Sequence, residues 1–266
     1  PKRGDEHRVA NRSDFKKIEV GALIAGGGIA GSALFRYMAD SGLNPVLVNA
    51  DRGSSWRNIG GGRTAFSLPE LAEIAEHNHT IFKELQKISN IDYKTTRYIN
   101  LAHDESTFNA LDASRAWSDA YMVDPKNFQK EISPYFSTKS KRYLGALITN
   151  DCWQATPGKV VDLIRNMGIS AGGRIVEDCK VLEVMKEGST YSILVLTHDK
   201  KYVEFRTEIF VNALGAGAGK ICEGLGIHAG LYPVRHQAFI TRRLPMLGKN
   251  GDSLDMLIDR QEYKGF

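Results

Sequence analysis

A run of closely spaced glycines near the start of the chain is its clearest sign of chemistry. In the stretch IAGGGIAGS, Gly26, Gly28 and Gly31 have the spacing G-x-G-x-x-G. After a strand, the first glycine allows a tight turn, the second lets the backbone approach a pyrophosphate, and the third lets helix and strand pack closely. The following helix offers phosphates the positive end of its dipole and the N–H groups of its first turn, where Ile29 and Ala30 lie. The spacing predicts a dinucleotide site, with a ligand-free glycine-rich turn as the alternative.

The residues around this motif have the pattern of a βαβ unit. The apolar run IEVGALIA, residues 18–25, precedes the glycines as a buried parallel strand would. Apolar residues then recur at helical spacing over 29–38, and Gly42 is a signal for the end of a helix. The segment PVLVN, residues 45–49, follows as a second strand. This context favours a functional glycine motif over a chance match.

The position that normally binds the ribose departs from the usual pattern. An acidic residue about twenty positions after the glycines hydrogen-bonds the ribose in this kind of unit. Here the second strand ends in Asn49, and Asp51 follows two residues later. Either side chain can take the role, and adenosine is expected to bind less tightly.

Helix and strand signals continue along the chain. Ser67-x-x-Glu70 predicts a capping box in front of a long amphipathic helix with the apolar residues Leu71, Ile74, Ala75, Ile81, Phe82, Leu85 and Ile88. A second helix, VVDLIRNMG, is expected to start after Thr156 and Pro157 and to stop at Gly168. Strands are expected at 96–104, 174–176, 180–184, 191–197 and 202–213, with a hairpin turn near 198–200 and a second glycine-rich turn, VNALGAGAG, at 211–219.

The composition is that of a globular protein. Of the 266 residues, 42% are hydrophobic and 25% charged, and the net charge of +4 comes from basic residues spread along the chain. We therefore expect no nucleic-acid partner. No apolar run reaches the ~18 residues that a membrane span needs, so no span is expected. Cys152, Cys179 and Cys222 form no CxxC pair, which argues against a zinc site and against a disulfide framework. This cysteine content favours a reducing, cytoplasmic location.

The loop after the second strand separates two kinds of dinucleotide. Residues 46–63 read VLVNADRGSSWRNIGGGR, and a nicotinamide-binding unit would not normally carry this Ser-Ser-Trp-Arg-Asn-x-Gly-Gly stretch. From Ile18 onward the chain resembles the D-amino-acid oxidase-like family of FAD-dependent oxidoreductases, which includes glycine and sarcosine oxidases and related amine dehydrogenases. Similar segments follow in the order of the family: DCWQATPGKVVDLI at 151–164, GGRIVEDCKVLEV at 172–184, VNALGAGA at 211–218 and PVRHQAFI at 233–240.

The resemblance implies a fold and a division of the chain. The fold class is α/β, with a Rossmann-like FAD-binding domain of the GR2 type interleaved with a mixed-sheet substrate domain that is C-terminally incomplete. The FAD-binding domain is expected at 18–89 and 143–231, and the partial substrate domain at 90–142 and 232–266. Residues 1–17 are polar and aperiodic, and are expected to be a flexible tail.

The resemblance also implies FAD as the cofactor. Some amine dehydrogenases of this group attach FAD covalently through a histidine in the loop after the second strand. The matching position here is Arg57, which predicts non-covalent FAD. The residues expected to hold it are Gly26, Gly28, Ile29, Ala30, Gly31, Asn49, Asp51, Ser54, Ser55, Arg57, Asn58, Gly60, Gly61, Gly62, Val181, Ala213 and Gly215.

The implied reaction is oxidation of a C–N bond in a small-molecule amino acid or secondary amine, with hydride passing to flavin N5. The amine must be neutral for this step. A substrate carboxylate would need a clamp, for which Arg63, Arg97 and Arg235 are candidates by residue type alone. His236, within an apolar strand pattern, is expected to pack at a sheet face, and His79 to lie on the surface of its helix. No catalytic residue is assigned.

The end of the chain limits this interpretation. Chains of the family continue well beyond the last residues here, DRQEYKGF, and the residues that would complete the substrate site are not found. A truncated portion of a longer protein, a partner subunit that completes the site, or a lost activity would each account for this. The main interpretation is an FAD-dependent amine or amino-acid oxidoreductase. The alternative is a catalytically incomplete FAD-binding fragment or regulatory relative, while the loop disfavours an NAD-dependent dehydrogenase.

Overall fold

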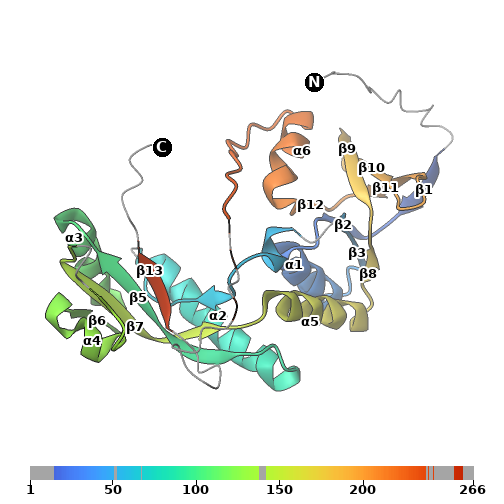
Figure 1. Cartoon of the computed structure of the whole chain (residues 1–266). Helices are drawn as coiled ribbons and strands as arrows, with labels where there is room; N and C mark the ends of the chain where they lie inside the picture. The colour runs from blue at the N-terminus through green and yellow to red at the C-terminus, as the bar shows by residue number, and fades with distance from the viewer. Residues whose placement is uncertain are drawn as a thin grey trace. The chain divides into compact units, whose positions relative to one another are not determined.

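The computed structural model describes residues 15–50, 53–66, 68–137, 142–237, 239, 242 and 255–259. The chain divides into two compact units, the first from Pro1–Asn58 and Val160–Ala238 and the second from Ile59–Lys159 and Phe239–Phe266 (Figure 1). The expected boundaries stay a prediction.

A four-stranded parallel sheet lies at the centre of the first unit. Its order is β12-β2-β3-β8, with β12 at Phe210–Asn212, β2 at Ala22–Ala25, β3 at Pro45–Val48 and β8 at Arg174–Val176. Every residue of β2 and β3 is buried, as expected for parallel strands that are covered on both faces. The helix α1, at Ile29–Asp40, packs Phe35 against Ile24 and Leu47 of these strands. The βαβ unit predicted from the sequence is confirmed.

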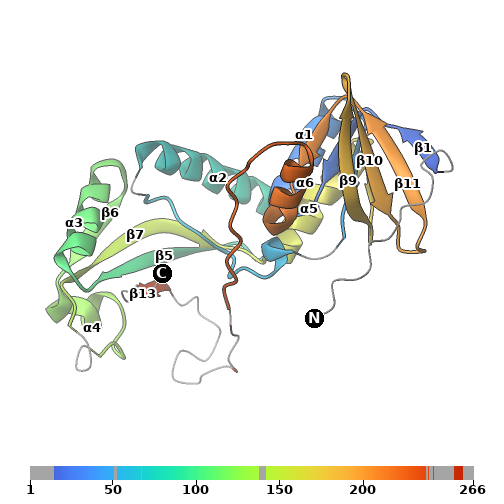
Figure 2. The same ribbon diagram turned by 90° about the horizontal axis from the view of Figure 1, so that it is seen from above.

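A second, mostly antiparallel sheet packs on the first. Its order is β1-β11-β10-β9, with the strands at Lys16–Glu19, Tyr202–Thr207, Thr190–Leu196 and Lys180–Glu187 (Figure 2). The predicted hairpin near 198–200 is confirmed, because β10 and β11 pair antiparallel. Leu23 and Val46 of the parallel sheet share one core cluster with Ile193, Val195 and Phe205.

Two segments that the sequence predicts as single strands each divide between the two sheets. The first run forms β1 and β2, and β1 begins at Lys16, inside the segment expected to be a flexible tail. The run 202–213 likewise forms β11 and β12. The two places where the chain passes from one sheet to the other lie side by side. There the Val20 N–H donates to Arg206 O at 3.0 Å and the Thr207 hydroxyl donates to Gly21 O at 3.2 Å. Apolar runs alone do not reveal such a change of sheet.

The helix α5, at Pro157–Ser170, continues past its predicted stop. Gly168 is buried inside the helix, and a Cβ there would lie 2.5 Å from the Phe35 ring of α1. This glycine therefore allows two helices to approach closely, and it does not end the helix. The late glycine-rich turn forms the short 3-10 helix η5 at Gly215–Gly217 and the helix α6 at Ala218–Gly224.

The second unit is built on a five-stranded sheet. The order is β13-β5-β7-β4, with β6 also pairing with β7; the strands lie at Met256–Asp259, Lys94–Ala102, Gly145–Gln154, Gly61–Gly62 and Ala120–Val123. Its helices are α2 at Pro69–Ile88, α3 at Glu105–Ala113 and α4 at Phe128–Glu131, with the 3-10 helices η3 at Ser114–Trp117 and η4 at Pro125–Asn127. No helix among the described residues is long and apolar enough to cross a membrane.

The buried face of α2 differs from the predicted one. Leu68 is the N-cap and makes no side-chain capping bond, while Ser67 of the expected capping box lies outside the described residues. Three of the expected core residues, Leu71, Ile74 and Ile88, are exposed. His79, expected on the surface, is buried and stacks on Trp153 with ring centroids 4.5 Å apart.

His79 can be buried because its polar atoms have partners. Its Nε2 lies 2.7 Å from the Tyr93 hydroxyl, and its Nδ1 lies 3.5 Å from Asp151 Oδ2. Burial lowers the pKa of His79, with the nearby Asp151 carboxylate opposing that shift. A buried helix face that is predicted from apolar residues alone leaves out a histidine whose ring nitrogens have polar partners.

The apolar strand pattern around His236 does not form a strand over the described part of that segment. Residues 227–237 contain neither helix nor strand, and His236 is exposed. The packing of His236 at a sheet face is therefore a wrong prediction. Ala238, Ile240 and Thr241 lie outside the described residues.

Candidate dinucleotide site

The first glycine turn connects β2 to α1 in an unusual backbone conformation. Gly26 has φ +105°, a value that residues other than glycine rarely adopt. Its N–H donates a hydrogen bond to Val48 O at 2.8 Å. Gly28 is the N-cap of α1, and the first helical bond runs from the Ser32 N–H to Gly28 O at 2.8 Å. The N–H groups before Ser32 therefore have no acceptor within the helix, as at the start of any helix. They form the positive end of α1.

The second glycine turn lies directly against the first. Because β12 is the neighbour of β2, the ends of the two strands meet, and the Ala213 N–H donates to Ala25 O at 2.8 Å. A Cβ on Gly26 would lie 2.6 Å from the carbonyl carbon of Ala213. Open parallel sheets bind ligands outside the carboxyl ends of their strands. Both turns occupy that edge.

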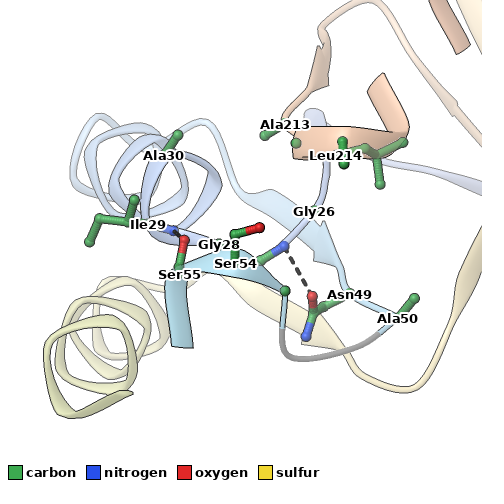
Figure 3. Close-up of a pocket in the computed structure, with 14 residues that line it drawn as sticks. Gly26, Gly28, Ile29, Ala30, Asn49, Ala50, Ser54, Ser55, Ala213 and Leu214 are labelled. Carbon is green, nitrogen blue, oxygen red and sulfur yellow. Dashed lines mark hydrogen bonds between the residues drawn. The ribbon is translucent and has the colours of Figure 1, made fainter. Parts of the chain in front are cut away.

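A third segment reaches the same place from the loop after β3. The 3-10 helix η2, at Ser54–Trp56, brings the Ser55 hydroxyl to 3.0 Å from the N–H of Ile29, from which it accepts a hydrogen bond (Figure 3). A Cβ on Gly28 would lie 3.0 Å from this hydroxyl. The loop at 46–63, whose sequence favours a flavin over a nicotinamide, therefore contacts the first turn of α1 through Ser55.

These segments enclose a cavity of about 400 Å³, which we call the turn cavity. Nine residues expected to hold the cofactor line it: Gly26, Gly28, Ile29, Ala30, Asn49, Ser54, Ser55, Ala213 and Gly215. Sequence reasoning missed Gly27, Ala50, Gly53, Leu214 and Ala216, all of which adjoin expected residues in the chain. None of these fourteen described residues has an ionisable side chain, so the attraction for an anion comes from backbone N–H groups and the dipole of α1.

The other expected cofactor residues that the structure describes lie elsewhere. Gly31 packs under the turn, where a Cβ would lie 3.2 Å from that of Ala213. Val181 belongs to β9 and packs against the core. Asp51 lies outside the described residues. Gly60, Gly61 and Gly62 belong to the second unit, where the last two form β4.

Arg57 and Asn58 line a second cavity of the first unit, with a volume of about 600 Å³. This cavity shares Ser54 and Ala216 with the turn cavity. Arg235 and His236 also line it, so two arginines face the same space. A positively charged hollow of this kind favours an anionic ligand.

The remaining arginine candidates have partners in the second unit. Arg97 is bound by Asp255, which raises the pKa of the guanidinium, and it also donates to Glu131 O at 2.8 Å. Arg63 lies with its guanidinium carbon 4.4 Å from the centre of the Phe66 ring. We find no grouping of histidine, cysteine and acidic side chains that could hold a metal in the parts of the chain that the structure describes.

The turn cavity fits a diphosphate. A Cβ on Gly26 or Gly28 would meet the backbone or the Ser55 hydroxyl, so only glycine keeps the cradle open. A helix N-terminus faces it, and none of the described residues that line it carries a carboxylate that would repel phosphate. Together with the parallel sheet, this geometry defines a dinucleotide-binding α/β protein.

The sequence assigns the family within that class. Residues 22–264 match the DAO family, described as FAD dependent oxidoreductase, and the chain belongs to it. The family is FAD dependent, so the cofactor predicted from the sequence is confirmed at the level of the family. The D-amino-acid oxidase-like resemblance is confirmed in the same way.

Three known proteins are similar to this chain. Over 272 residues, the chain is 26% identical to subunit A1 of an anaerobic glycerol-3-phosphate dehydrogenase from Haloferax volcanii, covering 91% of this chain and 43% of that protein. Over 238 residues, it is 22% identical to 4-methylaminobutanoate oxidase (formaldehyde-forming) from Paenarthrobacter nicotinovorans, covering 86% and 28%. The crystal structure of L-proline dehydrogenase from P. horikoshii matches with a TM-score of 0.67 and 19% identity, covering 80% and 56%. The chain thus spans less than half the length of the two curated relatives.

Proposed function

We propose that this chain is the FAD-binding part of an oxidoreductase that oxidises a C–N bond of an amino acid or secondary amine. The observation that carries the proposal is the meeting of three distant segments, both glycine turns and η2, around one cavity whose described lining residues have no ionisable side chain. When bound, FAD accepts the hydride that leaves the substrate carbon. The role that we propose for this chain is to bind the cofactor.

Two cavities of the first unit that share lining residues would hold the cofactor. The N–H groups at the start of α1 would bind the diphosphate in the turn cavity, beside the Ser55 hydroxyl that accepts the Ile29 N–H. The second cavity shares Ser54 with the first and adds the charges of Arg57 and Arg235, so the cofactor can extend into it. Arg57 has no nucleophilic nitrogen like that of histidine, which supports non-covalent FAD.

A cofactor titration tests the first part of the proposal. The purified chain should take up FAD, shift the flavin absorption bands and melt at a higher temperature with FAD than without it. Precipitation with acid should then release all of the flavin into the supernatant. A chain that stays colourless and melts at the same temperature with excess FAD would refute the proposal, and flavin that stays with the precipitate would refute non-covalent binding.

Substrate class needs a separate measurement, because one relative favours a second candidate. The similarity to a glycerol-3-phosphate dehydrogenase subunit favours oxidation of an alcohol carbon in a phosphorylated polyol. The similarity to 4-methylaminobutanoate oxidase favours the amine. Under anaerobic conditions, bleaching of bound flavin by secondary amines or amino acids supports the first candidate, and bleaching by glycerol 3-phosphate supports the second. Flavin that binds and bleaches with neither identifies an incomplete or regulatory FAD-binding chain.

A further inference from the structure

Three side chains form a hydrogen-bonded chain behind the first glycine turn. Asn49, at the end of β3, accepts the Gly27 N–H through Oδ1 at 3.1 Å and donates through Nδ2 to Glu177 Oε2 at 2.9 Å. Glu177 directly follows β8, and its other carboxylate oxygen accepts a hydrogen bond from Arg165 of α5. The chain therefore connects α5, β8 and β3 to the turn, although Asn49 and Glu177 are 128 residues apart.

The carboxylate of Glu177 determines which way the Asn49 amide faces. An ionised carboxylate only accepts hydrogen bonds, so the NH₂ group of Asn49 must point toward it. The carbonyl oxygen is then directed at the Gly27 N–H. Asn49 is 7% exposed, and a Cβ on Gly27 would lie 2.9 Å from the Asn49 Cγ, so this contact is tightly packed.

We propose that Glu177 is a positioning residue for the cofactor turn, acting through Asn49. This proposal rests on the proposed function, because the turn that it positions is the one assigned to the diphosphate. It accounts for an amide where dinucleotide-binding units usually have an acid. An acid at position 49 would face the Glu177 carboxylate, and two carboxylates in contact cannot both remain ionised without a penalty.

Arg165 is the cationic partner of Glu177 at this place. Its side chain is 10% exposed, and its guanidinium carbon lies 5.9 Å from the centre of the Trp56 ring in η2. The same arginine therefore contacts the carboxylate that directs Asn49 and the 3-10 helix that supplies Ser55. It balances the charge of Glu177 and packs against the segment beside the turn cavity.

The substitution Asn49→Asp separates this proposal from the usual role of the position. If residue 49 bound the ribose directly, the new carboxylate would tighten FAD binding. Under the proposal, the introduced carboxylate and Glu177 repel each other and the Gly27 N–H loses its fixed acceptor, so the dissociation constant for FAD rises about 10-fold or more. The melting temperature of the chain without FAD falls as well. Unchanged or tighter FAD binding would overturn the proposal.

The double variant Asn49→Asp with Glu177→Gln restores a pair of one amide and one carboxylate, with the carboxylate now at position 49 and the amide at position 177. The glutamine amide donates to the aspartate, whose second oxygen accepts the Gly27 N–H, so FAD affinity and melting temperature return to within about 3-fold and a few degrees of Glu177→Gln alone. A double variant that is no better than Asn49→Asp would overturn the proposal. Glu187→Gln is the matched control, because Glu187 has a similarly exposed carboxylate paired with Arg206 in the same unit.

The melting measurements without FAD keep the two proposals distinguishable. If the native chain does not bind FAD, the proposed function fails, but the rescue of melting temperature still reports on the contact between Asn49 and Glu177. If FAD binds and the variants fail to show the rescue, the positioning role fails and the proposed function stands.

Discussion

Three glycines of the turn cavity allow the effects on folding and on cofactor binding to be measured separately. Gly26 has φ +105°, and a Cβ there would lie 2.6 Å from the carbonyl carbon of Ala213. Gly28 has φ −67°, and a Cβ there would meet only the Ser55 side chain, at 3.0 Å from its hydroxyl. Gly53 has φ −72°, and a Cβ there would have no atom within 4 Å. Alanine at these positions should therefore give three different results.

The expected magnitudes follow from these contacts. Gly26→Ala combines a strained φ with a clash against backbone that cannot rotate away, so it should lower the free energy of unfolding by about 2–4 kcal/mol. For a chain of this size, that corresponds to a fall in melting temperature of roughly 5–15 °C. Gly28→Ala should cost less than about 1 kcal/mol, because the Ser55 hydroxyl can turn aside. Gly53→Ala should be close to neutral for stability.

Cofactor affinity should follow a different order. In Gly28→Ala, the new methyl group would lie beside the N–H groups that we propose to hold the diphosphate, and it would displace the Ser55 hydroxyl. Losing one or two charge-assisted hydrogen bonds, at about 1.5 kcal/mol each, weakens FAD binding roughly 10- to 100-fold. Gly53→Ala should bind FAD within about 3-fold of the native chain.

The assay combines thermal melting without FAD and FAD titration by flavin fluorescence on each variant. The reasoning predicts a stable Gly28→Ala chain that binds FAD poorly, next to a stable Gly53→Ala chain that binds it well. It is refuted if Gly28→Ala binds FAD as tightly as Gly53→Ala does, because the start of α1 would then not hold the diphosphate.

Further predictions concern the rest of the chain. Gly168→Ala should destabilise the first unit by about 1–3 kcal/mol, measured by urea unfolding, because the methyl group would overlap the Phe35 ring. Burial lowers the pKa of His79 from its ordinary 6.5, so the folded state disfavours the charged form, and stability should fall as the pH drops below 6.5. His79→Phe should flatten that dependence in urea midpoints measured at pH 7.5 and 5.5, and an unchanged slope would contradict it. Burial also raises the pKa of the Cys152 and Cys179 thiols, so iodoacetamide should label both only as the chain unfolds, as mass spectrometry of the peptides can show.

The elements that are local in sequence were predictable. The βαβ unit combines an apolar run, a glycine motif, helical spacing and a second apolar run within about thirty residues, and each signal agrees with the others. The long helix α2 was predictable as an element, but its buried face was not. Leu71 and Ile74 fit an apolar stripe, yet the structure turns Ala72 and His79 toward the core, because Tyr93 and Asp151 supply partners for the imidazole.

The places where strands change sheets were not predictable from periodicity. An apolar run reads the same whether it stays in one sheet or crosses to another, and the two crossings depend on each other through bonds such as that from Val20 to Arg206. The same limit applies to Asn49. Its departure from an acid was visible in the sequence, but the carboxylate that explains it, Glu177, stands next to it only because β3 and β8 are neighbours.

The late glycine turn shows why the sheet order matters more than the motif. The segment Gly215–Gly217 forms only a short 3-10 helix, and the α6 helix after it has seven residues, so neither provides a phosphate site by itself. Its contribution comes from β12 lying next to β2, which places Ala213 and Leu214 against Gly26 and makes them one wall of the turn cavity. A change that weakened the pairing of β12 with β2 would therefore open the turn cavity without altering any glycine. For this reason, we expect the affinity for FAD to depend on β12 as strongly as on the glycine motif itself.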